Sequence, residues 1–154
     1  MILPVAREKQ RLDQVFSLVA ILPKDEEVLS HWARYLCVLT SGFLENSLRT
    51  LLQFYTEKHA NKTVADFVLS EVKHITNLNE DKIVQLLGSF STTWRDTFLS
   101  LRSPEQKDAI DSVVANRHLI AHGKQVGISF VQIKEYYGSI SKVVKILDEE
   151  CINK

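Results

Sequence analysis

The stretch VLSHWARYLCVLTSGFLENSLRTLLQFYTEKH, residues 28–59, decides the fold class of this chain. It contains no proline, and its apolar side chains recur every three or four residues, which places them along one side of a helix. That stripe comprises Trp32, Tyr35, Leu36, Leu39, Phe43, Leu51, Phe54 and Tyr55. The pattern predicts one long helix with a buried face. Gly42 weakens such a helix by about 1 kcal/mol, so we expect it to mark a close contact with a neighbouring helix.

The sequence on both sides of this stretch is predicted to be helical as well. Helix caps mark several boundaries: Asn79 precedes one apolar pattern, and Ser-x-x-Gln capping boxes begin at Ser103 and Ser129. The expected helices span residues 7–21, 28–59, 63–75, 80–101, 103–122 and from 129 onward. No segment shows the alternation of a strand. The sequence therefore predicts an all-α fold, a single-domain bundle of about six helices over residues 1–154.

The overall composition is that of an ordinary globular protein. Nineteen basic side chains balance nineteen acidic ones, so no global field attracts nucleic acid or an anionic membrane, and any RNA binding must rely on a local site. Cys37 and Cys151 stand far apart within apolar patterns and are expected in the core. Because neither a signal peptide nor an apolar stretch of membrane-spanning length is visible, we expect a cytoplasmic protein.

The segment Arg117-His118-Leu119-Ile120-Ala121-His122 concentrates the polar groups that a reaction site would use. Arg117 falls on the apolar face of its helix, where a guanidinium needs a partner. His118 and His122 are four residues apart and therefore neighbours, whereas Arg117 and His122 are separated by roughly 140° around the helix. One copy does not point Arg117 and His122 at the same atom. Two copies packed about a twofold axis would bring both into a shared cleft, so we expect a dimer-interface site.

Arginine and histidine in such a cleft suit the cleavage of RNA without a metal. Histidine exchanges protons near neutral pH, and arginine stays charged and holds a phosphate in two-point contact. The 2'-hydroxyl of RNA is an internal nucleophile, so the protein need not supply one. A divalent metal shared by His118 and His122 is a weaker alternative, because only the remote Glu45 is available as a further ligand.

Arg117, four intervening residues and His122, followed by Gly123 in an all-helical chain, resemble the Arg-x4-6-His motif of HEPN domains. The stretches Ser41-Gly42-Phe43-Leu44-Glu45 and Asn116 to Gly123 are most similar to the RiboL-PSP-HEPN or MAE_28990-like branch of that group. The resemblance implies a metal-independent endoribonuclease that acts as a homodimer, serves as a toxin or defence component, and leaves 2',3'-cyclic phosphate ends.

By position, the resemblance assigns phosphate binding to Arg117 and general acid or base catalysis to His122. His118 stands where the family commonly has Asn or Asp, and it is either a second catalytic imidazole or a helper. Glu45 and Asn116 are expected in supporting roles. We expect no cofactor, no bound metal and no membrane. The implied partners are a second copy of the chain, an RNA substrate and an antitoxin or other protein.

Two interpretations that need no catalysis stay open on the same residues. In the first, Arg117 is structural and ties its helix to Glu45 on the long helix. In the second, the chain is a helical module that binds a protein partner or a nucleotide and uses Arg117 for structure or for contact with phosphate. His122 separates these interpretations from the nuclease, since only cleavage requires it.

Overall fold

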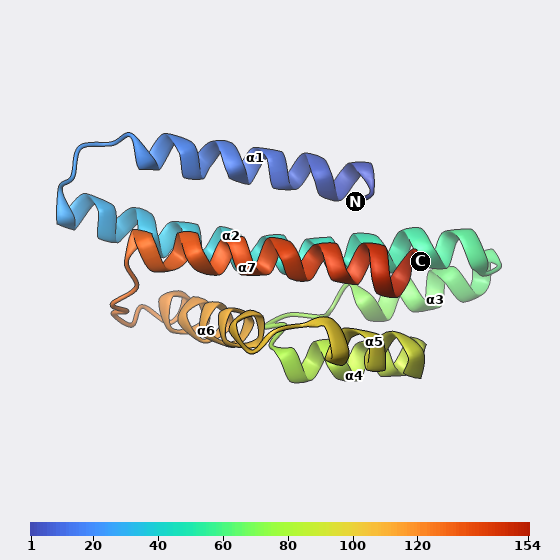
Figure 1. Cartoon of the computed structure of the whole chain (residues 1–154). Coiled ribbons are helices and arrows are strands. Elements are labelled where there is room, and N and C mark those ends of the chain that lie inside the picture. The colour runs from blue at the N-terminus through green and yellow to red at the C-terminus, as the bar shows by residue number, and fades with distance from the viewer.

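The computed structural model describes the whole chain, residues 1–154, which folds into helices and their connections (Figure 1). The elements are α1 Leu3–Ala20, α2 Glu26–His59, α3 Lys62–Val72, α4 Glu80–Phe90, α5 Thr92–Leu101, α6 Pro104–Ala121, α7 Phe130–Ile146 and the π-helix η1 Leu147–Ile152. The predicted all-α bundle is confirmed, and no strand is present. None of the helices combines the length and apolarity that crossing a membrane requires.

The long helix α2 forms the axis of the bundle. Helices α1 and α7 run alongside it, and α6 packs against both α2 and α7 (Figure 1). Twenty-nine buried apolar residues form one continuous core. Those of α2 include Leu36, Phe43, Leu44, Leu48 and Leu51, each at most 1% exposed. Burying a side chain of this size contributes about 1.5–3 kcal/mol. Of the predicted stripe, Leu36, Phe43 and Leu51 are buried, whereas Tyr35 and Phe54 are 53% and 47% exposed, so the buried face of α2 is confirmed only in part.

Helix caps lie where the sequence predicts them. The side chains of Asn79, Ser103 and Ser129 accept hydrogen bonds from the first turns of α4, α6 and α7 at 3.0, 3.3 and 3.1 Å. Gln106 and Gln132 complete both capping boxes by accepting from the backbone N–H groups of Ser103 and Ser129. The start of α6, the helix that carries Arg117 and His122, is therefore fixed by its own sequence.

The predicted single helix over residues 80–101 is wrong, because this segment forms two helices. The backbone of Ser91 is extended (φ −160°, ψ 124°), which ends α4 and allows the Ser91 side chain to cap α5. The indole of Trp94 stacks on Phe90 with ring centroids 5.8 Å apart, and it packs edge-on against Tyr55 of α2 at 4.7 Å. These aromatic contacts across the break offset the backbone hydrogen bonds that a continuous helix would have made.

Gly42 does not mark a close helix contact, contrary to the prediction. A Cβ atom at this position would have no other heavy atom within 4 Å. The space beside the middle of α2 is open, so packing within the chain does not require a glycine there.

Both cysteines are free and buried, as predicted. Burial raises the pKa of the Cys37 thiol to about 12 and is the main reason that the pKa of Cys151 rises to about 11. The thiolate is the reactive form of cysteine, and at neutral pH both residues remain thiols. Neither therefore offers a nucleophile.

Candidate functional site

The C-terminal end of α6 fixes the backbone that carries the two histidines. Helix α6 ends at Ala121 with His122 as its C-cap, and Gly123 follows with a left-handed φ of 68°. The backbone N–H groups of Gly123 and Lys124 donate to the carbonyls of Ile120 and Leu119 at 3.0 and 2.9 Å, which are the two bonds of a Schellman motif. The helix end predicted at His122 and Gly123 is confirmed.

Replacing Gly123 by alanine is expected to destabilise the protein by about 1–2 kcal/mol, because a left-handed backbone forces Cβ against a carbonyl oxygen. Gly127→Ala is the matched control, since Gly127 lies in the same connection with open space around it and without a left-handed φ. Urea unfolding of the two variants measures the difference. Equal stabilities would show that the Schellman turn does not hold His122 in place.

His118 and His122 lie side by side at this helix end. Their ring centroids are 4.5 Å apart and the ring planes are inclined by 59°. Both residues are exposed, and neither ring forms a hydrogen bond within the chain. Two neighbouring imidazoles can supply one proton acceptor and one proton donor, and both are open to a substrate.

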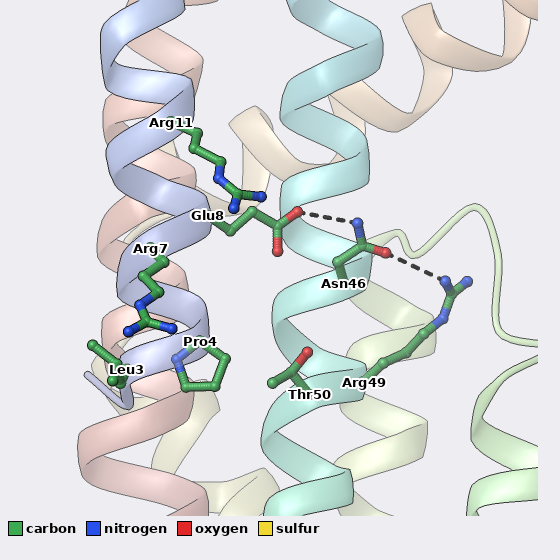
Figure 2. A pocket seen from close by; sticks show the side chains of 8 residues that line it. All are labelled: Leu3, Pro4, Arg7, Glu8, Arg11, Asn46, Arg49 and Thr50. Carbon is green, nitrogen blue, oxygen red and sulfur yellow. Dashed lines mark hydrogen bonds between the residues drawn. The ribbon is translucent and has the colours of Figure 1, made fainter.

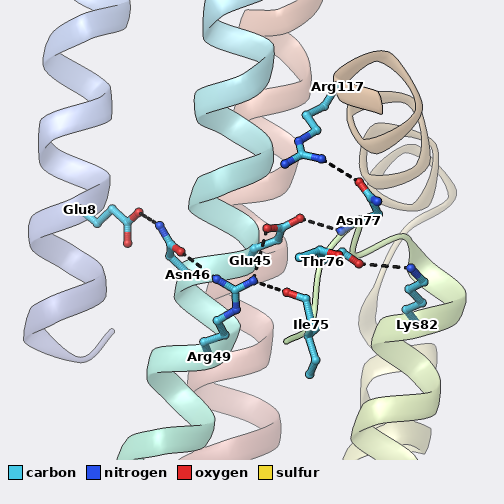
Figure 3. A network of polar contacts seen from close by, with 9 residues as sticks. All are labelled: Glu8, Glu45, Asn46, Arg49, Ile75, Thr76, Asn77, Lys82 and Arg117. Carbon is cyan, nitrogen blue, oxygen red and sulfur yellow. Dashed lines mark hydrogen bonds and ion pairs between the residues drawn. The ribbon is translucent and has the colours of Figure 1, made fainter. Parts of the chain in front are cut away.

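Arg117 is half-buried and points toward the segment between α3 and α4 (Figure 3). Its Nη1 donates to the side-chain oxygen of Asn77 at 3.0 Å. The backbone N–H of Asn77, a residue with a left-handed φ of 52°, donates to Oε1 of Glu45 at 2.8 Å. Arg117 thus reaches Glu45 through Asn77 and not by the direct tie to Glu45 that the structural interpretation predicts. Its Nη2 and Nε form no hydrogen bond within the chain.

The Glu45 carboxylate connects this anchor to a second arginine on α2. Its Oε2 lies 3.6 Å from Nη2 of Arg49, which also donates to the backbone carbonyl of Ile75. Nη1 of Arg49 donates to Asn46 at 3.5 Å, and Asn46 donates to Glu8 of α1 at 3.0 Å. One polar network therefore runs from α6 across the α3–α4 segment and α2 to α1 (Figure 3). Glu45 is 8% exposed with both oxygens engaged, which fits a role in holding its neighbours in position.

A surface groove of about 470 Å³ opens beside this network, between α6 and the start of α4. Its walls include Asn77 and His118, together with Asn79, Lys82 and Asp111. Asn77 thus contacts Arg117 and also lines the groove to which His118 belongs. Asn77 contacts both Arg117 and Glu45, it lines one groove with His118, and His122 lies beside His118.

Asn116 does not join this network. Its side-chain amide donates to the backbone carbonyl of Ser112, one turn earlier on α6, at 2.8 Å. Glu45 contacts Asn77 and Arg49 and forms no hydrogen bond with either histidine. No three His, Cys, Asp or Glu side chains lie close enough together to hold a metal ion.

Sequence reasoning missed Asn77 and Arg49 as members of the network. Asn77 lies in a connection that is longer than predicted, because α3 ends at Val72. Asparagine is among the few residues that tolerate a left-handed backbone, so Asn77 carried a signal for a turn. Arg49 follows Glu45 by four residues, the spacing of an ion pair along a helix. Both signals indicate local structure, and neither points to Arg117.

Comparison with known families agrees with this helical architecture. The model of the family described as RiboL-PSP-HEPN matches residues 6–153, which is almost the whole chain. No curated protein and no solved structure gives a match.

Proposed function

Because the chain belongs to the RiboL-PSP-HEPN family, we propose that it is a metal-independent endoribonuclease. It acts in the cytoplasm as a homodimer, as a toxin or as a component of a defence system. The observation that carries the proposal is the pair of exposed imidazoles, His118 and His122, beside the anchored Arg117 at the end of α6. This combination supplies proton transfer and phosphate binding without a metal.

The proposed reaction is an internal attack on the RNA backbone. The 2'-oxygen forms a bond to phosphorus while the bond from phosphorus to the 5'-oxygen breaks. One imidazole accepts the proton of the 2'-hydroxyl, and an imidazolium gives a proton to the departing 5'-oxygen. The products are a 2',3'-cyclic phosphate and a 5'-hydroxyl. His122 performs one of the two transfers, and His118 is the candidate for the other.

Arg117 stabilises the negative charge that builds up on the phosphate during this step. Its Nη1 is held by Asn77, so the guanidinium has a fixed direction, and its Nη2 and Nε have no hydrogen-bond partner within the chain. A side chain fixed in advance loses less rotamer entropy when it binds phosphate. Asn77 and Glu45 are therefore proposed as positioning residues that act through Arg117.

The proposed site takes groups from two protomers. Within one copy, Arg117 is directed toward the α3–α4 segment, whereas His122 stands at the helix end against His118. A twofold contact between two α6 helices gives each protomer's Arg117 access to the partner's His122. We also expect an antitoxin or other protein partner that restrains the nuclease.

Purified protein is expected to cut a mixture of transfer and messenger RNA in excess EDTA, because no step of the proposed reaction requires a metal. Mass analysis of the fragments then finds 2',3'-cyclic phosphate and 5'-hydroxyl ends. Uncut RNA with a folded dimer, or cleavage that EDTA abolishes, would contradict the proposal.

A second candidate is a non-catalytic module that binds a protein partner or a nucleotide. It is favoured by one observation: Arg117 already takes part in a network that joins α6 to α2. In that case cleavage is absent from purified protein, and His122→Ala leaves both function and stability nearly unchanged.

A further inference from the structure

A second groove, between α1 and α2, carries a concentration of positive charge (Figure 2). It has a volume of about 590 Å³, and eight residues line it. Three of them are the arginines Arg7, Arg11 and Arg49, and the only acid is Glu8, which accepts a hydrogen bond from Asn46. Since the whole chain has a net charge of zero, this local excess stands out from the rest of the surface.

Two of these arginines have no partner in the chain. Arg7 and Arg11 are exposed, lie four residues apart on α1, and form neither an ion pair nor a side-chain hydrogen bond. Like charges at this spacing destabilise a helix. By contrast, the nearby Lys9 of the same helix forms an ion pair with Asp13 at 2.8 Å. An unpaired arginine pair in a groove is the arrangement that an anionic ligand would neutralise.

Polar contacts link the groove to the candidate site. Arg49 and Asn46 line it, and both also belong to the network that ends at Arg117 (Figures 2 and 3). In both figures α1 and α2 present the same face, with the α3–α4 segment beside them. The groove and the cavity that His118 lines share no residue, so a strand that contacts both would cross the exposed surface between them.

The composition of the groove indicates which part of a nucleic acid it contacts. Its lining includes no aromatic side chain on which a base could stack, and its functional groups are guanidinium groups, one amide, one hydroxyl and one carboxylate. Guanidinium groups bind phosphates and by doing so position a strand without reading its sequence.

We propose that Arg7 and Arg11 bind the phosphate backbone of the RNA strand that enters the Arg117–His122 site, independently of base sequence. Arg49, whose guanidinium contacts Glu45, Asn46 and the carbonyl of Ile75, forms the wall of the groove between α1 and α2. This inference rests on the proposed ribonuclease function for the identity of the ligand. It adds a binding surface on α1 and α2 that lies outside the Arg117–His122 motif of α6.

The test is equilibrium binding of fluorescent 20-nucleotide oligo(U) and oligo(A) RNA, followed by anisotropy. The protein carries His122→Ala, so that bound RNA is not cut. Adding Arg7→Ala and Arg11→Ala is expected to weaken binding on the order of tenfold at low salt, and to reduce the slope of log affinity against log salt by about 1.4, or about 0.7 per lost phosphate contact. Arg7→Lys with Arg11→Lys retains both charges and is expected to keep most of the salt slope.

The matched control is Lys58→Ala with Lys134→Ala, which removes two exposed positive charges from other parts of the surface. Its affinity is expected to stay within about twofold of the parent. Unchanged binding in the Arg7 and Arg11 variant, or an equal loss in the lysine control, would contradict the proposal that this groove binds RNA. A loss seen with only one of the two RNA sequences would overturn backbone recognition.

Failure of this inference and failure of the nuclease proposal give different results. If wild-type protein cuts RNA but the Arg7 and Arg11 variant binds it normally, the proposed RNA binding in the groove is wrong and the proposed nuclease activity is supported. If wild-type protein does not cut RNA but RNA binding depends on these arginines, the groove binds RNA as proposed and the chain is a non-catalytic binding module.

Discussion

His122→Ala is expected to lower RNA cleavage by about 10²–10⁴-fold, the contribution that a positioned acid or base commonly makes. The imidazole is exposed and has no hydrogen bond within the chain, so its removal leaves no buried group without a partner. The variant should unfold at the same urea concentration as the wild type. Initial rates on a long RNA, measured beside urea unfolding, check both halves of this expectation.

The control for His122 is His31→Ala, because His31 is also an exposed helical histidine but lies near the start of α2. Full activity is expected in that variant. His118→Ala tells the two roles of His118 apart: a loss as large as that of His122→Ala identifies a second catalytic imidazole, and a smaller loss identifies a helper. Undiminished cleavage by His122→Ala would contradict the proposed chemistry.

Arg117→Lys is expected to reduce cleavage by about 10²–10³-fold although the charge is kept. Lysine is a point charge, and it does not bind Asn77 and a phosphate at the same time in the fixed geometry of a guanidinium. Arg117→Ala additionally leaves the Asn77 amide without its donor, which costs about 1 kcal/mol of stability. Separate measurement of kcat and KM shows where the loss falls, and an effect on kcat indicates stabilisation of the transition state.

Arg95→Lys is the matched control for Arg117→Lys, since Arg95 is a partly exposed arginine of α5 that pairs with Asp96. It should cut RNA at the wild-type rate. Retention of normal kcat and KM in Arg117→Lys would show that the site does not depend on the guanidinium.

Much of the fold follows from local signals in the sequence. The apolar stripe of residues 28–59, the cap at Asn79 and the capping boxes at Ser103 and Ser129 all predict helices that the structure contains. These signals are local, because a cap or a stripe depends on residues within one or two turns. The break at Ser91 has a local part, since serine is a favoured N-cap residue and caps α5, and a distant part, the contact of Trp94 with Tyr55 of α2.

The same distinction applies to the site. The neighbouring positions of His118 and His122 follow from helix geometry alone. The partner of Arg117 does not, because Asn77 is 40 positions away and reaches it through a left-handed turn. The arginines of the second groove come from α1 and α2, and their meeting depends on how these two helices pack. Local sequence patterns therefore do not predict the contacts of the site that join distant segments of the chain.

The exposed positions near the site are relevant to dimer formation. Leu119 is 41% exposed at the end of α6, beside the two histidines in sequence. In the proposed dimer, this side chain would be buried when a second copy binds.

The most direct test of a composite site is to mix two inactive variants, Arg117→Ala and His122→Ala, after unfolding and refolding them together. A mixed dimer retains one Arg117 and one His122 on opposite protomers, and random pairing restores about a quarter of the wild-type rate if the site is shared. Two different affinity tags establish that mixed dimers form. Recovery of cleavage in EDTA is the result that the proposed site predicts. An inactive mixture in which mixed dimers are present, or a wild-type protein that is monomeric at micromolar concentration, would contradict it.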